Sequence, residues 1–250
     1  MDSVPMGRMG QMKIVVNGDS FTHERHFAVG EDYIEKTWAY KIGAENIALG
    51  GCSNDRIFHS TIDYLNKNNP DVLIIGWTTF DRYFMTHVDG LNIHITPGSV
   101  ANDLLYGFNS NENQLQEYQH FYYKKMHNTF LNFKNFIMYY KHIEKYCATN
   151  DIKYLNFCAI SPLPLGKKIT DIAKTAYMSK KDKDVYQQGV LHNAKILNNE
   201  LRTFDKQHWI NQQIGFCYRS HVDHLPKWPD GHPGLEASAL WTKIIENNLK

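Results

Sequence analysis

The first third of the chain alternates short apolar runs with segments of helical periodicity. Three apolar runs predict strands: K-I-V-V (13–16), E-N-I-A-L (45–49) and V-L-I-I-G-W (72–77). Between them, apolar residues recur at helical spacing, first in a helix that contains Trp38 and stops near Gly43, then in one that Ser53 or Asn54 would cap. Strands without polar alternation, separated by helices, are typical of a parallel sheet covered on both faces.

The remaining sequence continues this pattern, interrupted by two irregular segments. We expect one long helix, or two with a bend, over 113–148, a strand at 154–160, a helix over 191–204, a fifth strand near 214–218 and a last helix from about 235. The segments at about 83–112 and 161–184 are too irregular for ordinary connections and are interpreted as insertions. Residues 1–11 are expected to be a flexible N-terminus, a cloning scar or a false start, and 12–250 a single domain.

Composition excludes several classes of function. The formal net charge is +1, which gives no electrostatic footprint for nucleic acid or an anionic membrane. No apolar run approaches the ~20 residues of a membrane span, and the N-terminus lacks the apolar region of a secretory signal, so we expect a cytoplasmic protein. The four cysteines are scattered and are interpreted as free thiols. Fifteen Tyr and five Trp could stack on a sugar or a base, although packing also uses them.

Polar residues follow each of the predicted strands. Ser20 ends N-G-D-S after the first strand, G-G-C-S-N follows the second, G-W-T-T-F-D-R includes the end of the third, and P-D-G-H-P-G precedes the last helix. Ligands of parallel sheets bind beyond the carboxyl ends of the strands. A serine nucleophile needs an imidazole base, a group that orients the imidazole, and N–H donors for the oxyanion. The four loops contain all of these residue types.

This order of motifs resembles the SGNH (GDSL-type) hydrolase family over nearly the whole framework. The resemblance implies a flavodoxin-like, three-layer α/β/α fold with a mostly parallel five-stranded sheet, and an esterase that needs no cofactor or metal. It makes Ser20 the nucleophile and first oxyanion donor, His232 the general base and Asp230 the residue that orients it. Gly51 matches the glycine whose N–H completes the oxyanion hole.

Two positions depart from the family pattern. Thr78 stands where the family usually has asparagine, so either its hydroxyl or the amide of Asn54 would serve as the third oxyanion donor. Asp230 and His232 are two residues apart, whereas the commonest spacing is Asp-x-x-His. Three further residues in these loops are candidate substrate-binding residues: Asp19, Trp77 and Arg82.

The sequence therefore predicts a serine esterase that hydrolyses small acyl esters, acetyl esters foremost, on a polar scaffold such as a saccharide. Transfer of the acyl group to another alcohol stays open, because the sequence does not reveal how well the site excludes water. A glycan-binding module with weakened catalysis is the alternative from another class. Three histidines and two aspartates within 221–232 also leave a metal-dependent hydrolase open.

Overall fold

The computed structural model describes residues 12–23, 36–86, 92–95, 100–102, 117, 121–122, 126, 129–163, 195–228 and 231–250. Its main sheet has four strands, in the order β2 (Glu45–Asn46), β1 (Ile14–Gly18), β3 (Val72–Trp77) and β7 (Lys153–Cys158). All three neighbouring pairs are parallel, with Gly18 opposite Gly76 and Trp77 opposite Cys158. The order is that of the first four strands of a flavodoxin-like sheet. The predicted parallel architecture is confirmed.

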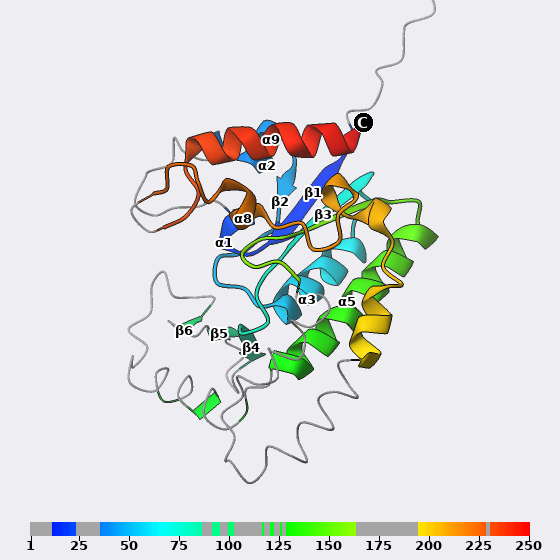
Figure 1. Ribbon diagram of the computed structural model, residues 1–250. Coiled ribbons are helices and arrows are strands. Elements are labelled where there is room, and N and C mark those ends of the chain that lie inside the picture. Colours follow the sequence, from blue (N-terminus) through cyan, green and yellow to red (C-terminus); the bar gives the residue numbers. More distant parts are fainter. Residues whose placement is uncertain are drawn as a thin grey trace, which may run out of the picture.

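Helices cover both faces of this sheet. In chain order they are α1 (Ser20–His23), α2 (Trp38–Lys41), α3 (Asn54–Leu65), α5 (Thr129–Thr149), α8 (Tyr218–Val222) and α9 (Leu235–Leu249), with 3-10 turns η3 (Lys206–His208) and η4 (Ile210–Gln212). Residues 195–201 are helical as well. Figure 1 shows α2 and α9 on one side of the sheet and α3 and α5 on the other. These three layers match the α/β/α arrangement expected.

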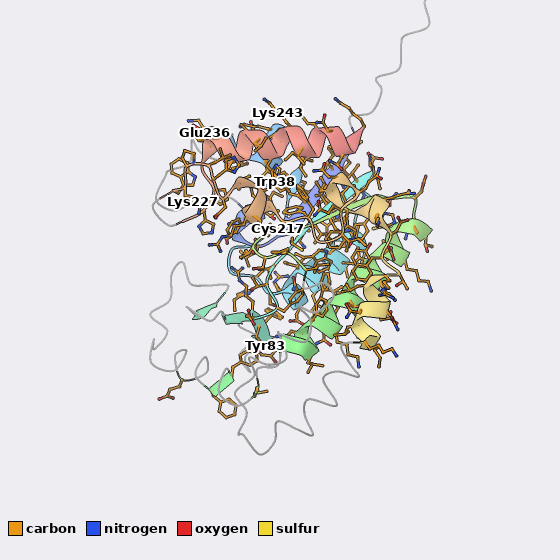
Figure 2. The ribbon with its side chains drawn as sticks, viewed as in Figure 1. Trp38, Tyr83, Cys217, Lys227, Glu236 and Lys243 are labelled. Carbon is orange, nitrogen blue, oxygen red and sulfur yellow. The ribbon has the colours of Figure 1, made fainter. Side chains whose placement is uncertain are left out.

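Both sides of the sheet are buried, which explains why its strands lack polar alternation. In β1, Val15 packs with the α3 and α5 layer, whereas Ile14 and Val16 pack with the α2 and α9 layer. Trp38 of α2 is fully buried and lies beneath α9 in Figure 2, in which Glu236 and Lys243 project from α9 away from the sheet. In α9, an apolar side therefore faces the sheet and a charged side faces away from it.

The predicted fifth strand is wrong. Residues 214–218 contact β7 through a single parallel bridge between Cys158 and Cys217, together with a hydrogen bond from the Cys158 N–H to the Phe216 carbonyl (2.8 Å). Gly215 has a φ of +75°, and α8 begins at Tyr218, so the chain leaves the sheet on both sides of this bridge. Among the described residues the sheet has four strands, and β7 has two isolated parallel bridges, from Asn156 to Trp209 and from Cys158 to Cys217, in place of a fifth strand.

The second strand is shorter than expected, although its path continues alongside β1. Only Glu45–Asn46 is regular strand, and hydrogen bonds from the Ile47 and Leu49 N–H groups to the carbonyls of Val16 and Gly18 follow it. The Asn46 side chain accepts from the Ala48 N–H (3.0 Å), so this N–H is satisfied within its own segment. The chain still reaches the edge of the sheet at the same end as β1.

The segment at 83–112, which was predicted to be an insertion, contains a second sheet. Its three antiparallel strands are β4 (Tyr83–Thr86), β5 (Asn92–Ile95) and β6 (Val100–Asn102). Figure 1 shows this sheet apart from the main one, near the start of α5. The predicted features at 1–11 and 164–184, the start of the helix at 191–204 and most of the segment at 113–128 lie outside the described residues. None of the described helices is long and apolar enough to cross a bilayer.

Candidate active site

The turn between β1 and α1 places Ser20 at the carboxyl edge of the main sheet. Ser20 is the first residue of α1 and is partly exposed, whereas Asp19 before it is fully buried. The Asp19 carboxylate accepts from the Phe21 N–H (3.0 Å), and its backbone carbonyl accepts from the N–H groups of Thr22 and His23. Asp19 therefore accepts hydrogen bonds from three consecutive N–H groups of α1, and these bonds fix the position of Ser20.

Two glycines allow α1 to approach the sheet closely. Gly18 and Gly76 lie opposite each other in β1 and β3. A Cβ atom at Gly18 would come within 2.3 Å of the Thr22 hydroxyl oxygen, and one at Gly76 within 2.5 Å of the same atom. Any side chain at either position would therefore push α1, and Ser20 with it, away from the strands.

The loop after β2 brings a glycine turn to Ser20. A hydrogen bond from the Cys52 N–H to the Leu49 carbonyl (3.4 Å) closes a four-residue turn, and Gly51 has the positive φ (+77°) that the third residue of a type II turn needs. A Cβ atom at Gly50 would lie 3.8 Å from the Ser20 Cβ, whereas one at Gly51 would meet nothing within 4 Å. Gly50, rather than Gly51, is therefore the glycine that faces Ser20, while Gly51 shapes the turn.

The two candidate third donors are bonded to each other. The Asn54 amide nitrogen donates to the Thr78 carbonyl (3.2 Å), and the Thr78 N–H donates to the Asn54 Oδ1 (2.9 Å). The Thr78 hydroxyl donates to the Asp19 Oδ2 (2.7 Å). A hydroxyl has one proton to donate, so in this arrangement Thr78 supports Asp19 rather than an oxyanion.

Ser53, not Asn54, caps α3, because its hydroxyl accepts from the Arg56 N–H (3.3 Å).

A buried ion pair joins the same loops. The Arg82 Nη1 lies 3.1 Å from the Asp19 Oδ2 and also donates to the Cys52 carbonyl (3.3 Å). The Arg82 side chain is 13% exposed, and that of Asp19 is 0% exposed. The expectation that Asp19 binds substrate is therefore corrected, because both of its carboxylate oxygens are occupied by the protein's own donors.

Trp77 does not line the site either. Its side chain is fully buried at the end of β3, packs edge-on against Phe136, and donates from its indole N–H to the Asn156 Oδ1 (2.7 Å). A tryptophan with no exposed surface and a satisfied N–H belongs to the core. The sequence-based interpretation of Trp77 as a substrate contact is wrong for this reason.

His232 reaches the site from the loop before α9. Its ring packs on Phe21, the residue after Ser20, with 5.0 Å between ring centroids. The loop is held by hydrogen bonds from the Trp228 N–H to the His232 carbonyl (2.9 Å) and from the Gly234 N–H to the Pro226 carbonyl (3.1 Å). Gly231 has a φ of +84°, so the backbone turns there as the close spacing of the motif requires. His232 thus contacts the residue that directly follows Ser20.

Asp230 lies outside the described residues, and its role stays a prediction. Among the residues that are described, no three His, Cys, Asp or Glu side chains are grouped as a metal ion would require. Within 221–232, the ring of His221 packs on Phe216, and Asp223 pairs with Lys227 (2.6 Å). This pairing lowers the pKa of the Asp223 carboxyl, chiefly through the hydrogen bond from the lysine.

Comparison with known proteins gives similarity of structure alone. No family model matches the sequence, and no curated protein matches it. The solved structure of TesA is 11% identical, with a TM-score of 0.45 over 96% of this chain and 98% of that one. A GDSL-like lipase from Bacteroides thetaiotaomicron is 10% identical (TM-score 0.42; 95% and 87% of the chains). The esterase EstA from Pseudoalteromonas sp. is 11% identical (TM-score 0.44; 95% and 96%). The likeness is distant.

Two residues beside Ser20 were missed in the sequence. Gly50 adjoins Ser20, and a Cβ atom at Gly50 would also lie 3.9 Å from the His23 Nδ1, so His23 belongs to the same small group. The signals were present but ambiguous. A double glycine does not reveal which member faces a neighbour, and a histidine three residues after a serine shares its helix face only if the turn becomes helical.

Proposed function

We propose that the protein is a serine ester hydrolase of the SGNH type, with Ser20 as nucleophile and His232 as general base. The observation that carries the proposal is the contact of the His232 ring with Phe21, directly beside Ser20, at the carboxyl edge of a parallel sheet. A nucleophile activated by a neighbouring imidazole is the minimum that this chemistry needs. Asp230 is proposed to orient the imidazole.

The reaction follows from these positions. Ser20 Oγ attacks the ester carbonyl while His232 accepts its proton, and the imidazolium then protonates the leaving alcohol. Water hydrolyses the acyl-enzyme through the same base. The oxyanion is stabilised by the N–H of Ser20, at the first position of α1, and by an N–H of the Gly50–Gly51 turn that adjoins it. A third donor from Thr78 would need its hydroxyl to leave Asp19.

The substrate is proposed to be a small acyl ester, acetyl foremost, on a polar scaffold such as a saccharide. Support comes from the Tyr, His and Asn content of 83–122, and from Tyr83 and Tyr122, whose rings stack at 4.2 Å where the insertion joins the domain. The preference is tested by comparing p-nitrophenyl acetate with the butyrate and octanoate esters and with acetylated xylo-oligosaccharides. Faster turnover of the octanoate would contradict it.

The proposal is tested by hydrolysis of p-nitrophenyl acetate with the wild type and Ser20→Ala. We expect the variant to lose at least about 10³-fold in kcat, because removal of the nucleophile leaves only the oxyanion donors and binding. Ser220→Ala is the matched control, since Ser220 is an exposed serine of α8. His224→Ala, an exposed histidine, is the matched control for His232→Ala.

The two alternatives predict other results in the same assay. Activity that a chelator abolishes but Ser20→Ala retains would move the chemistry to the histidine-rich segment 221–232. A folded wild type with no activity towards any of these esters would favour a glycan-binding module. That outcome has one observation in its favour, since the Thr78 hydroxyl and the Asn54 amide are both engaged within the protein.

A further inference from the structure

Among the described residues, Asp19 has a completely enclosed carboxylate at the edge of the main sheet. It is fully buried and receives three hydrogen bonds, from the Phe21 N–H, the Thr78 hydroxyl and Arg82 Nη1. A buried carboxylate is tolerated only when such donors replace its hydration, and when a cation compensates its charge. Among the described residues, Arg82 is the cation that forms an ion pair with it.

Arg82 joins three loops that carry parts of the site. Its own loop follows β3, its Nη1 reaches Asp19 in the loop after β1, and the same nitrogen donates to the Cys52 carbonyl in the loop after β2. Asp19 immediately precedes Ser20, and Cys52 closes the turn that contains Gly50 and Gly51. One guanidinium nitrogen therefore links the nucleophile turn to the glycine turn beside it.

We propose that Arg82 is a positioning residue, which holds Ser20 and the Gly50–Gly51 turn at a fixed separation by binding Asp19 and Cys52 together. This rests on the proposed function, in which Ser20 attacks and the backbone N–H groups of both turns receive the oxyanion. Donors aimed at the oxyanion act only if they are already in place when charge develops. Arg82 thus affects the chemical step without touching the substrate.

Two other roles for Arg82 lead to different measurements. A residue that binds substrate equally in the ground and transition states changes KM and leaves kcat unchanged. A residue that only stabilises the fold lowers the folded fraction, and the folded molecules keep their activity. A positioning residue lowers kcat in fully folded protein at nearly constant KM. The exposure of Arg82, at 13%, does not separate these roles by itself.

The first experiment measures kcat and KM for p-nitrophenyl acetate in Arg82→Met and Arg82→Lys, at a temperature where circular dichroism shows both to be folded. We expect Arg82→Met to lower kcat roughly 10–100-fold, as small misplacements of reacting groups do, with KM within about twofold. Arg82→Lys should recover part of the loss, because a compact ammonium keeps the charge but replaces the planar guanidinium fork. Lys141→Met is the matched control: Lys141 pairs with Glu200 on the surface of α5, and its loss should change neither constant.

A second variant removes the risk that Arg82→Met fails to fold. In Asp19→Asn/Arg82→Met the buried charge and its partner are both absent, while the amide oxygen can still accept from the Phe21 N–H. This variant should fold and still show the loss in kcat, since nothing then joins Asp19 to Cys52. Wild-type kcat in this folded variant, or a rise in KM alone in Arg82→Met, would overturn the proposal.

Hydrogen exchange gives a readout that does not depend on ester hydrolysis. In Arg82→Met, the amides of 20–23 and 50–52 should exchange faster than in the wild type, while those of β3 and β7 stay protected. Unchanged exchange in both segments would overturn the positioning role. A wild type without esterase activity would instead contradict the proposed function, and the exchange result would still decide whether Arg82 orders the two turns.

Discussion

Asp19 illustrates how a residue beside a proposed nucleophile can bind only groups of the protein itself. Its position in the loop after a strand suggested a substrate contact, yet the carboxylate binds Phe21, Thr78 and Arg82. The order of the loops along the sequence indicated that Ser20, the glycine turn and His232 would share an edge. The direction in which each side chain points could not be predicted, because it depends on bonds between loops that are distant in sequence.

Thr78→Val tests whether the threonine hydroxyl is an oxyanion donor. Valine has nearly the shape of threonine but cannot donate, so Asp19 loses one of three bonds. We expect the free energy of unfolding to fall by about 1–3 kcal/mol and kcat to fall less than about tenfold. Removal of a true oxyanion donor would cost roughly 10²–10³-fold in kcat. A loss of that size, measured with p-nitrophenyl acetate, would restore the sequence-based prediction for Thr78.

The contact of α1 with the sheet depends on the two glycines beneath it. Gly18→Ala places a Cβ atom 2.3 Å from the Thr22 Oγ1 and 2.9 Å from the Gly76 carbonyl oxygen. We expect the variant to lose about 1–3 kcal/mol in the free energy of unfolding, as overpacked sites do. Gly50→Ala is the control, because its Cβ atom would make only ordinary contacts at 3.8–3.9 Å. Equal urea midpoints for the two variants would contradict the close approach.

The start of α3 gives a second, smaller test. The buried Ser53 hydroxyl accepts from the Arg56 N–H and satisfies one of the free donors at the helix terminus. Ser53→Ala should lower the free energy of unfolding by about 1 kcal/mol, and Ser53→Asp by less, because aspartate is also a good cap. Urea unfolding measures both. A larger loss for Ser53→Asp than for Ser53→Ala would indicate that burial of Ser53 matters more than its cap.

Regular elements were predicted best where the local pattern was strong. Val72–Trp77 was located to the residue, because a short apolar run that follows the helix-breaking N-N-P-D is typical of a buried strand. The start of α9 and the end of α2 near Gly43, which has a φ of +67°, were also correct. The apolar segment at 214–218 looked equally strand-like. Whether it forms a strand, however, depends on how many of its residues pair with β7. The extent of this pairing cannot be read from the local sequence.

The four thiols are all buried, in different parts of the molecule, and their burial should make them unreactive in the folded protein. Cys52, Cys147, Cys158 and Cys217 are at most 5% exposed, and all are free. A thiol reacts as its thiolate, which needs access to water. We expect Ellman's reagent to modify none of them in the folded protein at pH 8 and all four in urea. Rapid modification of any one in the folded state would show that its layer opens.

Burial of the same groups predicts loss of stability in alkali. Burial raises the pKa of the Cys147 thiol from 9.0 to about 12. Between these values the unfolded chain releases a proton that the folded chain retains, so the free energy of unfolding falls as pH rises from 9 towards 12. Urea unfolding from pH 8 to 10 measures the slope. Cys147→Ala should reduce this slope, and an unchanged slope would contradict a thiol held neutral by burial.

The contact between Phe21 and His232 joins segments from the two ends of the sequence, and this has a consequence for biosynthesis. A chain still attached to the ribosome would already contain Ser20 and most of the sheet, but it would lack His232, the proposed base, until the segment before α9 had emerged. In the proposed mechanism, Ser20 would therefore become reactive late, after most of the sheet had formed. Under the proposed function, a nascent copy would be unable to act on an ester until the segment around His232 had packed against Phe21.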